Sequence, residues 1–143
     1  MIYCIVEGQT DKVILSIVLN ETCHIETKII VTDGFPSMPA VARTIMSFMN
    51  LGDKVMIVCD QDNFQEGKYG RDMLNFLLRG AMNNNSFELF TFDPNIDKLI
   101  SKPNEAKTWK RNHKLIETRV RDNINIILQE ETMKRIVEFA QKH

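Results

Sequence analysis

Short apolar runs and amphipathic segments alternate along the first two thirds of the chain. The apolar runs, which are typical of strands buried inside a sheet, occupy residues 2–6, 25–32, 55–59 and 87–92. The first three runs are each followed by a segment whose apolar residues recur every three or four positions, and this spacing predicts an amphipathic helix. Strands and helices in this order predict a parallel sheet with right-handed crossovers.

The amphipathic segments also predict how the helices begin and which residues they bury. Thr10 is placed to cap the first helix, which follows the turn at Gly8. We expect the third helix to pack through one apolar face formed by Met73, Leu74, Leu77 and Leu78. Beyond residue 100 the tail is largely helical, and its expected core-facing positions are Val120, Ile124, Ile127, Leu128, Met133, Ile136, Val137 and Ala140.

These elements together predict an α/β fold. We expect a small doubly wound, mainly parallel four-stranded sheet flanked by helices, with a helical C-terminal extension. Residues 1–100 would form the α/β core, and residues 101–143 a basic segment and a helical extension packed on the same domain. A length of 143 residues suits one domain with a hydrophobic core.

Composition narrows the class of protein. With 43% hydrophobic and 26% charged residues, the chain has the composition of a folded globular protein. Three scattered cysteines without zinc spacing indicate a reducing compartment, and no apolar run approaches the roughly 18 residues of a membrane span. We therefore expect a cytoplasmic protein with no membrane partner. A net charge of -1 means that contact with nucleic acid requires a local basic surface.

Acidic residues stand at the predicted ends of the strands. Asp60 and Asp62 follow the third apolar run, Glu7 follows the first, and Asp97 comes soon after the fourth. In an open α/β sheet, ligands bind beyond the carboxyl ends of the strands. Asp60 and Asp62 would point the same way in an extended backbone, and two such carboxylates favour a divalent cation between them. The alternative is a pair of turn or cap aspartates.

Basic and glycine residues supply candidates for substrate binding. Lys68 and Arg71 follow the acidic pair closely, where they could neutralise a phosphate group. A second basic run surrounds the lone Trp109 and could form an arm that contacts nucleic-acid phosphates; it includes Lys107, Lys110, Arg111 and Lys114. Exposed loop charges and a solvated helix are the alternatives.

The order of these elements resembles a TOPRIM domain, the metal-dependent module of type IA and type II topoisomerases, DnaG-type primases and OLD-family nucleases. The resemblance covers roughly residues 1–100. The motifs that carry it are strand-IVEGQTD-helix, strand-TDGFPSMPAVARTI-helix, strand-VCDQDN and strand-FDPNID. The glycine turn, the SMP pattern and the asparagine after D-x-D are closest to the OLD type.

This resemblance implies specific roles at the site. Glu7, Asp60 and Asp62 would be catalytic and would bind Mg²⁺, with Mn²⁺ able to substitute, while Asp97 could complete a second metal shell. Asp11 resembles the acidic residue that OLD-type enzymes use after their glycine, although a helix-dipole role explains it equally well. Gly8 and the turn glycine Gly34 would let the backbone approach substrate closely.

Two functions remain open from the sequence. The first is a magnesium-dependent nuclease that acts on nucleic acid, with DNA as the expected substrate, assisted by an ATPase or other protein partner or by self-association. The second is a non-catalytic TOPRIM-like module that binds nucleic acid or protein. Retention of Glu7 with both aspartates favours the nuclease. Topoisomerase action is disfavoured, because only Tyr3 in a buried strand and Tyr69 in a loop could attack a phosphodiester.

Overall fold

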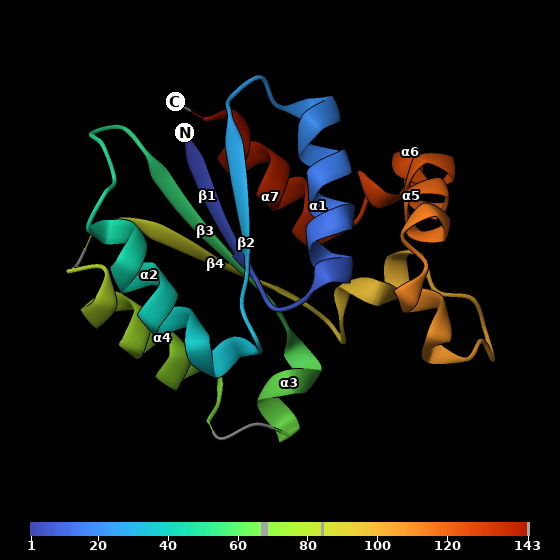
Figure 1. Ribbon diagram of the computed structural model, residues 1–143, viewed down its shortest axis with the longest axis horizontal. Helices are drawn as coiled ribbons and strands as arrows, with labels where there is room; N and C mark the ends of the chain where they lie inside the picture. Colours follow the sequence, from blue (N-terminus) through green and yellow to red (C-terminus); the bar gives the residue numbers. More distant parts are fainter. Residues whose placement is uncertain (67–68, 84, 143) are drawn as a thin grey trace.

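The four predicted strands form one parallel sheet (Figure 1). A computed structural model describes residues 1–66, 69–83 and 85–142 of the chain. The strands are β1 (Ile2–Val6), β2 (Thr27–Val31), β3 (Lys54–Asp60) and β4 (Phe87–Phe92), and their spatial order is β2-β1-β3-β4. All three pairings are parallel. The predicted α/β fold, with a four-stranded parallel sheet flanked by helices, is therefore confirmed.

Helices cover both faces of the sheet and create two hydrophobic cores (Figure 1). The first core lies under α1 (Gln9–Thr22), α5 (His113–Asp122), α6 (Ile124–Ile127) and α7 (Glu131–Gln141). The second lies under α2 (Met38–Met46) and α4 (Arg71–Ala81). Because successive strand residues point to opposite faces, Cys4 joins the first core and Ile5 the second. The central strands β1 and β3 are buried on both sides, which explains their uninterrupted apolar sequences.

The first helix begins differently from the prediction. Gly8, not Thr10, is the N-cap residue of α1, and Thr10 lies within the helix. The reason is Asp11, whose Oδ2 accepts a hydrogen bond from the Gly8 N–H at 3.1 Å. A carboxylate in the first turn can satisfy a free N–H group at the helix end, so the threonine is not needed as a cap.

The exposed side of α4 also differs from the prediction. Leu74 and Leu78 are fully buried in the second core, as expected. Met73 and Leu77 are 49% and 37% exposed, so the four apolar residues do not share one buried face. Ala81 completes the buried side instead. This helix is therefore apolar both toward the sheet and toward the solvent.

The predicted basic arm is a folded segment packed against the rest of the protein. It contains the short helix η3 (Lys107–Arg111), in which Trp109 is only 7% exposed. The Arg119 guanidinium lies 5.3 Å from the Trp109 ring. The expectation that Trp109 accompanies an arm at the surface is wrong, because this residue belongs to the first core.

The tail after residue 100 packs on the sheet and on α1. Its buried residues Val120, Ile127, Met133, Ile136 and Ala140 join the first core, as predicted, while Ile124, Leu128 and Val137 are partly buried against it. Within the described parts of the chain, no helix is both long enough and apolar enough to cross a membrane. Three further short helices, η1 (Phe35–Ser37), α3 (Gln61–Glu66) and η2 (Ile96–Leu99), lie near the carboxyl ends of the strands.

Candidate functional site

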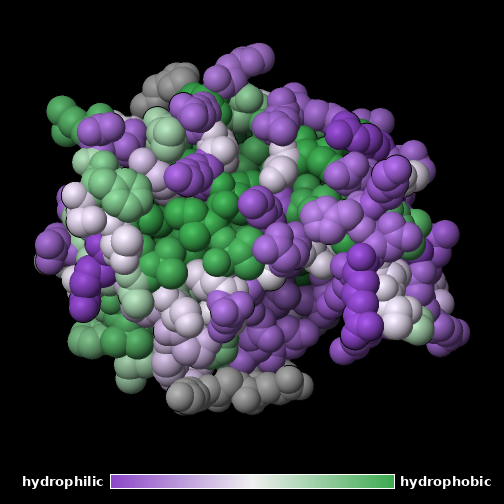
Figure 2. Space-filling view, in the orientation of Figure 1, coloured by the Kyte–Doolittle hydropathy of each residue, from purple (hydrophilic) through white to green (hydrophobic). Residues whose placement is uncertain are grey.

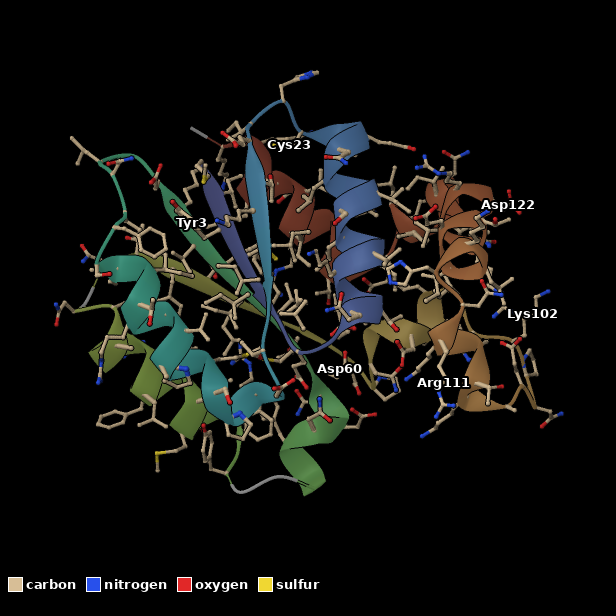
Figure 3. The ribbon with its side chains drawn as sticks, viewed as in Figure 1. Tyr3, Cys23, Asp60, Lys102, Arg111 and Asp122 are labelled. Atoms are coloured by element: carbon tan, nitrogen blue, oxygen red, sulfur yellow. The ribbon has the colours of Figure 1, made fainter. Side chains whose placement is uncertain are left out.

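Glu7 and Asp60 meet at the carboxyl ends of the two central strands. Glu7 directly follows β1 and Asp60 is the last residue of β3, so the parallel pairing brings them to the same edge of the sheet. The Asp60 N–H donates to Glu7 Oε1 at 3.2 Å, and Asn63 Nδ2 donates to Glu7 Oε2. Both oxygens of Glu7 are thus oriented by residues of the D-x-D-N motif. Figure 3 shows Asp60 at this end of the sheet.

The segment after β4 holds the two aspartates of that motif. The Ile96 N–H donates to Asp60 Oδ1 at 2.8 Å, and Asn95 Nδ2 donates to Asp62 Oδ2 at 3.0 Å. The Asp62 N–H in turn donates to the Pro94 carbonyl oxygen at 3.0 Å. Three separate parts of the chain, following β1, β3 and β4, therefore build one acidic site.

The secondary structure around Asp62 differs from the prediction. The strand ends at Asp60, and α3 begins at Gln61, so Asp62 lies in a helix and not in extended backbone. We expected Asp60 and Asp62 to point the same way because they stand two residues apart in an extended strand, and this expectation is wrong. Both still line one pocket, because the contacts with residues 94–96 place them on the same side.

Asp11 and Asp97 lie beside this pair of strand ends. Asp11, in the first turn of α1, is 8% exposed, and Asp97 lies in η2. Asp97 forms an ion pair with Lys110 Nζ. The two neighbouring aspartates bring further negative charge to the acidic site, and Lys110 compensates part of it.

Three carboxyl groups of the site, the buried Asp11 and the half-buried Asp60 and Glu7, have raised pKa values. Burial, followed by the negative charge of Asp11, raises the pKa of Asp60 to about 8. Burial, followed by the charge of Asp97, raises the pKa of Asp11 to about 7. Burial also raises the pKa of Glu7, against the hydrogen bonds from Asn63 and Asp60 that lower it. Desolvation and like charges both penalise the ionised form, so in the absence of a cation these carboxyl groups keep their protons to higher pH than free carboxyl groups do.

The donor chemistry of the site fits magnesium, although the carboxylates do not form a closed cage. Mg²⁺ prefers oxygen ligands, and Glu7, Asp60 and Asp62 provide them. Across the described ranges, no group of three or more His, Cys, Asp or Glu residues could hold a metal ion together. Each of Asp11, Asp60 and Asp62 uses one carboxylate oxygen as a hydrogen-bond acceptor. Among the same described residues, the other oxygen of each (Asp11 Oδ1, Asp60 Oδ2 and Asp62 Oδ1) accepts no hydrogen bond. A cation held by one or two carboxylates together with water is compatible with this geometry.

A polar pocket of about 470 Å³ opens beside the acidic site. Asp60, Asp62 and Asp97 line it from the sheet edge, and lysines from residues 101–111 line it as well. Figure 3 shows the segment of residues 101–111, with Lys102 and Arg111 labelled, on the same side of the molecule as Asp60. The lysines in the pocket are Lys102, Lys107 and Lys110. The pocket thus places cationic side chains near a carboxylate cluster, an arrangement that can accept a phosphate together with a cation.

The other predicted substrate-binding residues are more scattered. Arg71 lines a different pocket beside β4, where its Nη2 donates to the Leu89 carbonyl oxygen at 3.5 Å. Arg111 is exposed and is not part of the pocket lining. Gly34 has a φ of 92°, so the turn itself explains its glycine. The N–H of Gly8 binds Asp11, and Lys68 lies outside the described residues.

Several polar residues of the site were not predicted from the sequence, among them Asn63, Asn95 and Lys102. Asn63 orients Glu7, Asn95 binds Asp62, and Lys102 lines the pocket. The two asparagines stand within three residues of predicted acidic ligands, and this proximity is the signal that could have identified them. No sequence pattern indicated that Lys102 lies near the acidic residues, because its position in the pocket depends on how residues 101–111 fold back.

Comparisons with protein-family models, with curated proteins and with solved structures found no match to this chain.

Proposed function

We propose that this chain is a TOPRIM-like, magnesium-dependent protein that cleaves phosphodiester bonds in nucleic acid, with DNA as its substrate. The observation that carries the proposal is the group of carboxylates that meets at the ends of β1 and β3, where Glu7 and Asp60 are half-buried beside the buried Asp11. Raised pKa values at Asp11 and Asp60 indicate a site that costs free energy unless a cation enters. Proteins retain such perturbed groups most often at functional sites.

Glu7, Asp60 and Asp62 are the residues that would hold the ion. Magnesium is commonly bound through one or two carboxylates, with water and substrate phosphate as its remaining ligands, so a closed cage is not required. Asp11 and Asp97 would add negative charge around it. When bound, the ion would supply the positive charge that stabilises the phosphoryl oxygens during cleavage. Manganese can replace magnesium, because it accepts the same oxygen ligands.

The remaining residues of the site would orient the acids and bind the substrate. Asn63 and the Asp60 N–H fix Glu7, and the Ile96 N–H fixes Asp60. Lys102 and Lys107 would contact the phosphates that flank the cleaved bond. Because the whole chain has a net charge of -1, these few contacts would give weak, salt-sensitive binding. An ATPase or other protein partner would supply additional contact surface.

A non-catalytic TOPRIM-like module is the second candidate function. It is favoured by the ion pair between Lys110 and Asp97 and by the hydrogen bonds to both oxygens of Glu7. These contacts satisfy part of the acidic site without a metal. Such a module would bind nucleic acid or a partner protein through the lysines of the pocket, and it would leave phosphodiester bonds intact.

A nuclease assay with matched variants separates the two functions. Supercoiled plasmid, linear duplex and single-stranded DNA are incubated with Mg²⁺ or Mn²⁺ and with wild type, Glu7→Gln or Asp122→Asn. Gln keeps an oxygen that can accept the Asp60 N–H, removes the charge, and places an NH2 group where Glu7 Oε2 accepts a hydrogen bond from Asn63. Asp122 is an exposed carboxylate on α5, remote from Asp60 (Figure 3). We expect Glu7→Gln to lose at least about 100-fold in rate and Asp122→Asn to match wild type.

The outcomes are distinct. Equal cleavage by wild type and Glu7→Gln would identify a contaminating nuclease and contradict the proposal. Cleavage by none of the three proteins, with or without a candidate ATPase partner, would favour the non-catalytic module. Activity that requires the metal and Glu7, and that falls as salt is added, would support the nuclease.

A further inference from the structure

The helix α4 carries an apolar stripe on the side that does not face the sheet. Phe76 is 70% exposed, Met73 49% and Leu77 37%. Their spacing of three and four residues places them on one side of the helix, while Leu74, Leu78 and Ala81 fill the core. In Figure 1, α4 lies beside α2 at the margin of the molecule, and Figure 2 shows hydrophobic side chains in the same region.

The stripe is suited to contact with another helix. Gly80 lies one turn beyond Phe76 and Leu77, and a Cβ atom added there would meet nothing within 4 Å. A small residue in line with larger apolar side chains allows two helices to approach closely. Single exposed apolar residues are common on protein surfaces, but a contiguous stripe typically marks an interaction site. Its buried side already fills the core, so the exposed side has no packing role within this chain.

The charges beside the stripe make this helix complementary to itself. Asp72 and Arg79 are seven residues apart, two helical turns, and therefore lie on the same side of the stripe. In an antiparallel pair of identical helices about a two-fold axis, the start of one helix faces the end of the other. Asp72 of each copy then lies opposite Arg79 of the other, and Phe76, at the middle of α4, lies near the axis.

We propose that two copies of this chain associate through α4 as an antiparallel, two-fold symmetric dimer. The stripe of Met73, Phe76, Leu77 and Gly80 forms the centre of the interface, and two Asp72–Arg79 contacts flank it. Asp72 at one end of the stripe and Arg79 at the other carry opposite charges. They attract each other when the partner is a second copy of the chain in an antiparallel orientation. This inference does not depend on the proposed nuclease function, because α4 contributes no residue to the acidic pocket.

Sedimentation equilibrium of wild type and two glutamate variants tests the apolar stripe. Phe76→Glu places a charge at the centre of the interface and weakens the dimer by about 30-fold or more, as at other central aromatic positions. Leu51→Glu is the control, since Leu51 is fully exposed and lies outside α4. Wild type that remains a monomer at its highest soluble concentration overturns the proposal. A dimer unaffected by Phe76→Glu overturns it too.

Charge reversal tests the antiparallel arrangement separately. Asp72→Arg and Arg79→Asp each bring like charges together twice in a homodimer, so each variant alone dimerises more weakly than wild type. Mixed with each other, the two variants form a heterodimer in which both contacts are attractive again, and the double reversal also restores dimerisation. Melting temperatures verify that every variant is folded. If neither the mixture nor the double reversal recovers association, the antiparallel pairing is wrong.

Discussion

Two buried or half-buried charge clusters in this protein have opposite electrostatic character. In the C-terminal region, both Glu105 oxygens accept hydrogen bonds from Arg119, one of them at 2.6 Å. These bonds lower the pKa of Glu105 and raise that of Arg119. At the sheet edge, burial and neighbouring carboxylates raise the pKa of Asp60 to about 8 and that of Asp11 to about 7. Glu105 lines the same pocket as Asp60. An arginine compensates Glu105, whereas the charges that act on Asp60 come from other carboxylates.

The two clusters therefore respond to pH in opposite directions. Glu105 has a lowered pKa in the folded protein, so its contribution to stability exists above its unfolded pKa and is lost as pH falls through the folded value. Asp60 has a raised pKa, so the folded protein holds a proton that the unfolded chain releases between pH 3.8 and about 8. Stability from Asp60 consequently falls as pH rises across that interval.

The largest effect on stability is expected from removing the compensating arginine. Arg119→Met leaves Glu105 without its partner, removes the hydrogen bond to the Ile100 carbonyl at 3.3 Å and removes the cation over Trp109. We expect the melting temperature to fall by several degrees at pH 7. Arg121→Met is the control, because its ion pair with Glu21 is exposed and 3.6 Å long, and such pairs contribute little. If the two substitutions lower the melting temperature equally, Arg119 does not stabilise the fold more than an exposed ion pair does.

Neutralising Asp60 is expected to have the opposite sign. Asp60→Asn keeps an oxygen that can accept the Ile96 N–H, and it removes a charge that the metal-free fold does not compensate. The melting temperature of metal-free protein at pH 8 should rise by about 3 °C, equivalent to roughly 1 kcal/mol for a domain of this size. Near pH 4 the substitution should have little effect. A lower melting temperature at pH 8 would mean that Asp60 is structural.

A smaller effect of the same sign is expected from Asp11→Asn. The pKa of Asp11 is about 7, so its stability cost accumulates between pH 3.8 and about 7 and then levels off. Asn can still accept the Gly8 N–H, although the favourable charge at the start of α1 is lost. Thermal unfolding at pH 5 and pH 8 measures the difference. A stabilisation that is larger at pH 5 than at pH 8 would show that the Asp11 pKa is not raised by the fold.

The smallest effect is expected from Lys110→Met. Lys110 pairs with Asp97 and lowers the pKa of Asp11. Its removal should shift the Asp11 pKa further upward and change the free energy of unfolding by less than about 1 kcal/mol. A carboxyl NMR titration follows Asp11 directly. A downward shift of its pKa would show that Lys110 does not face the acidic cluster in solution.

The architecture could be predicted because its signals are local. Strands buried on both faces must be apolar throughout, so β1 and β3 were evident as uninterrupted runs. Parallel strands finish at the same edge, so Glu7 and Asp60 could be expected together from the sequence alone. These conclusions need only the order of elements and the direction of the strands.

The finer features depend on contacts between distant residues. Asp62 lies in α3, where Asn95 binds its side chain from 33 residues away. Trp109 is buried because Arg119 and the first core surround it, while its own neighbours in sequence are basic and polar. Met73 and Leu77 of the outer stripe of α4 were predicted to be core residues, because spacing alone cannot tell which of two apolar faces meets the sheet. Local patterns carry no information on these tertiary contacts.

Isothermal titration of Mg²⁺ and Mn²⁺ into wild type and Asp60→Asn tests the central claim most directly. The titrations are made at pH 6 and pH 8.5 in buffers that differ in ionisation enthalpy, because a cation that binds Asp60 must displace the proton that its raised pKa retains. We predict saturable binding to wild type that is tighter at pH 8.5, releases protons at pH 6, and is largely lost in Asp60→Asn. No saturable binding at either pH, or equal binding by the two proteins, would contradict the account.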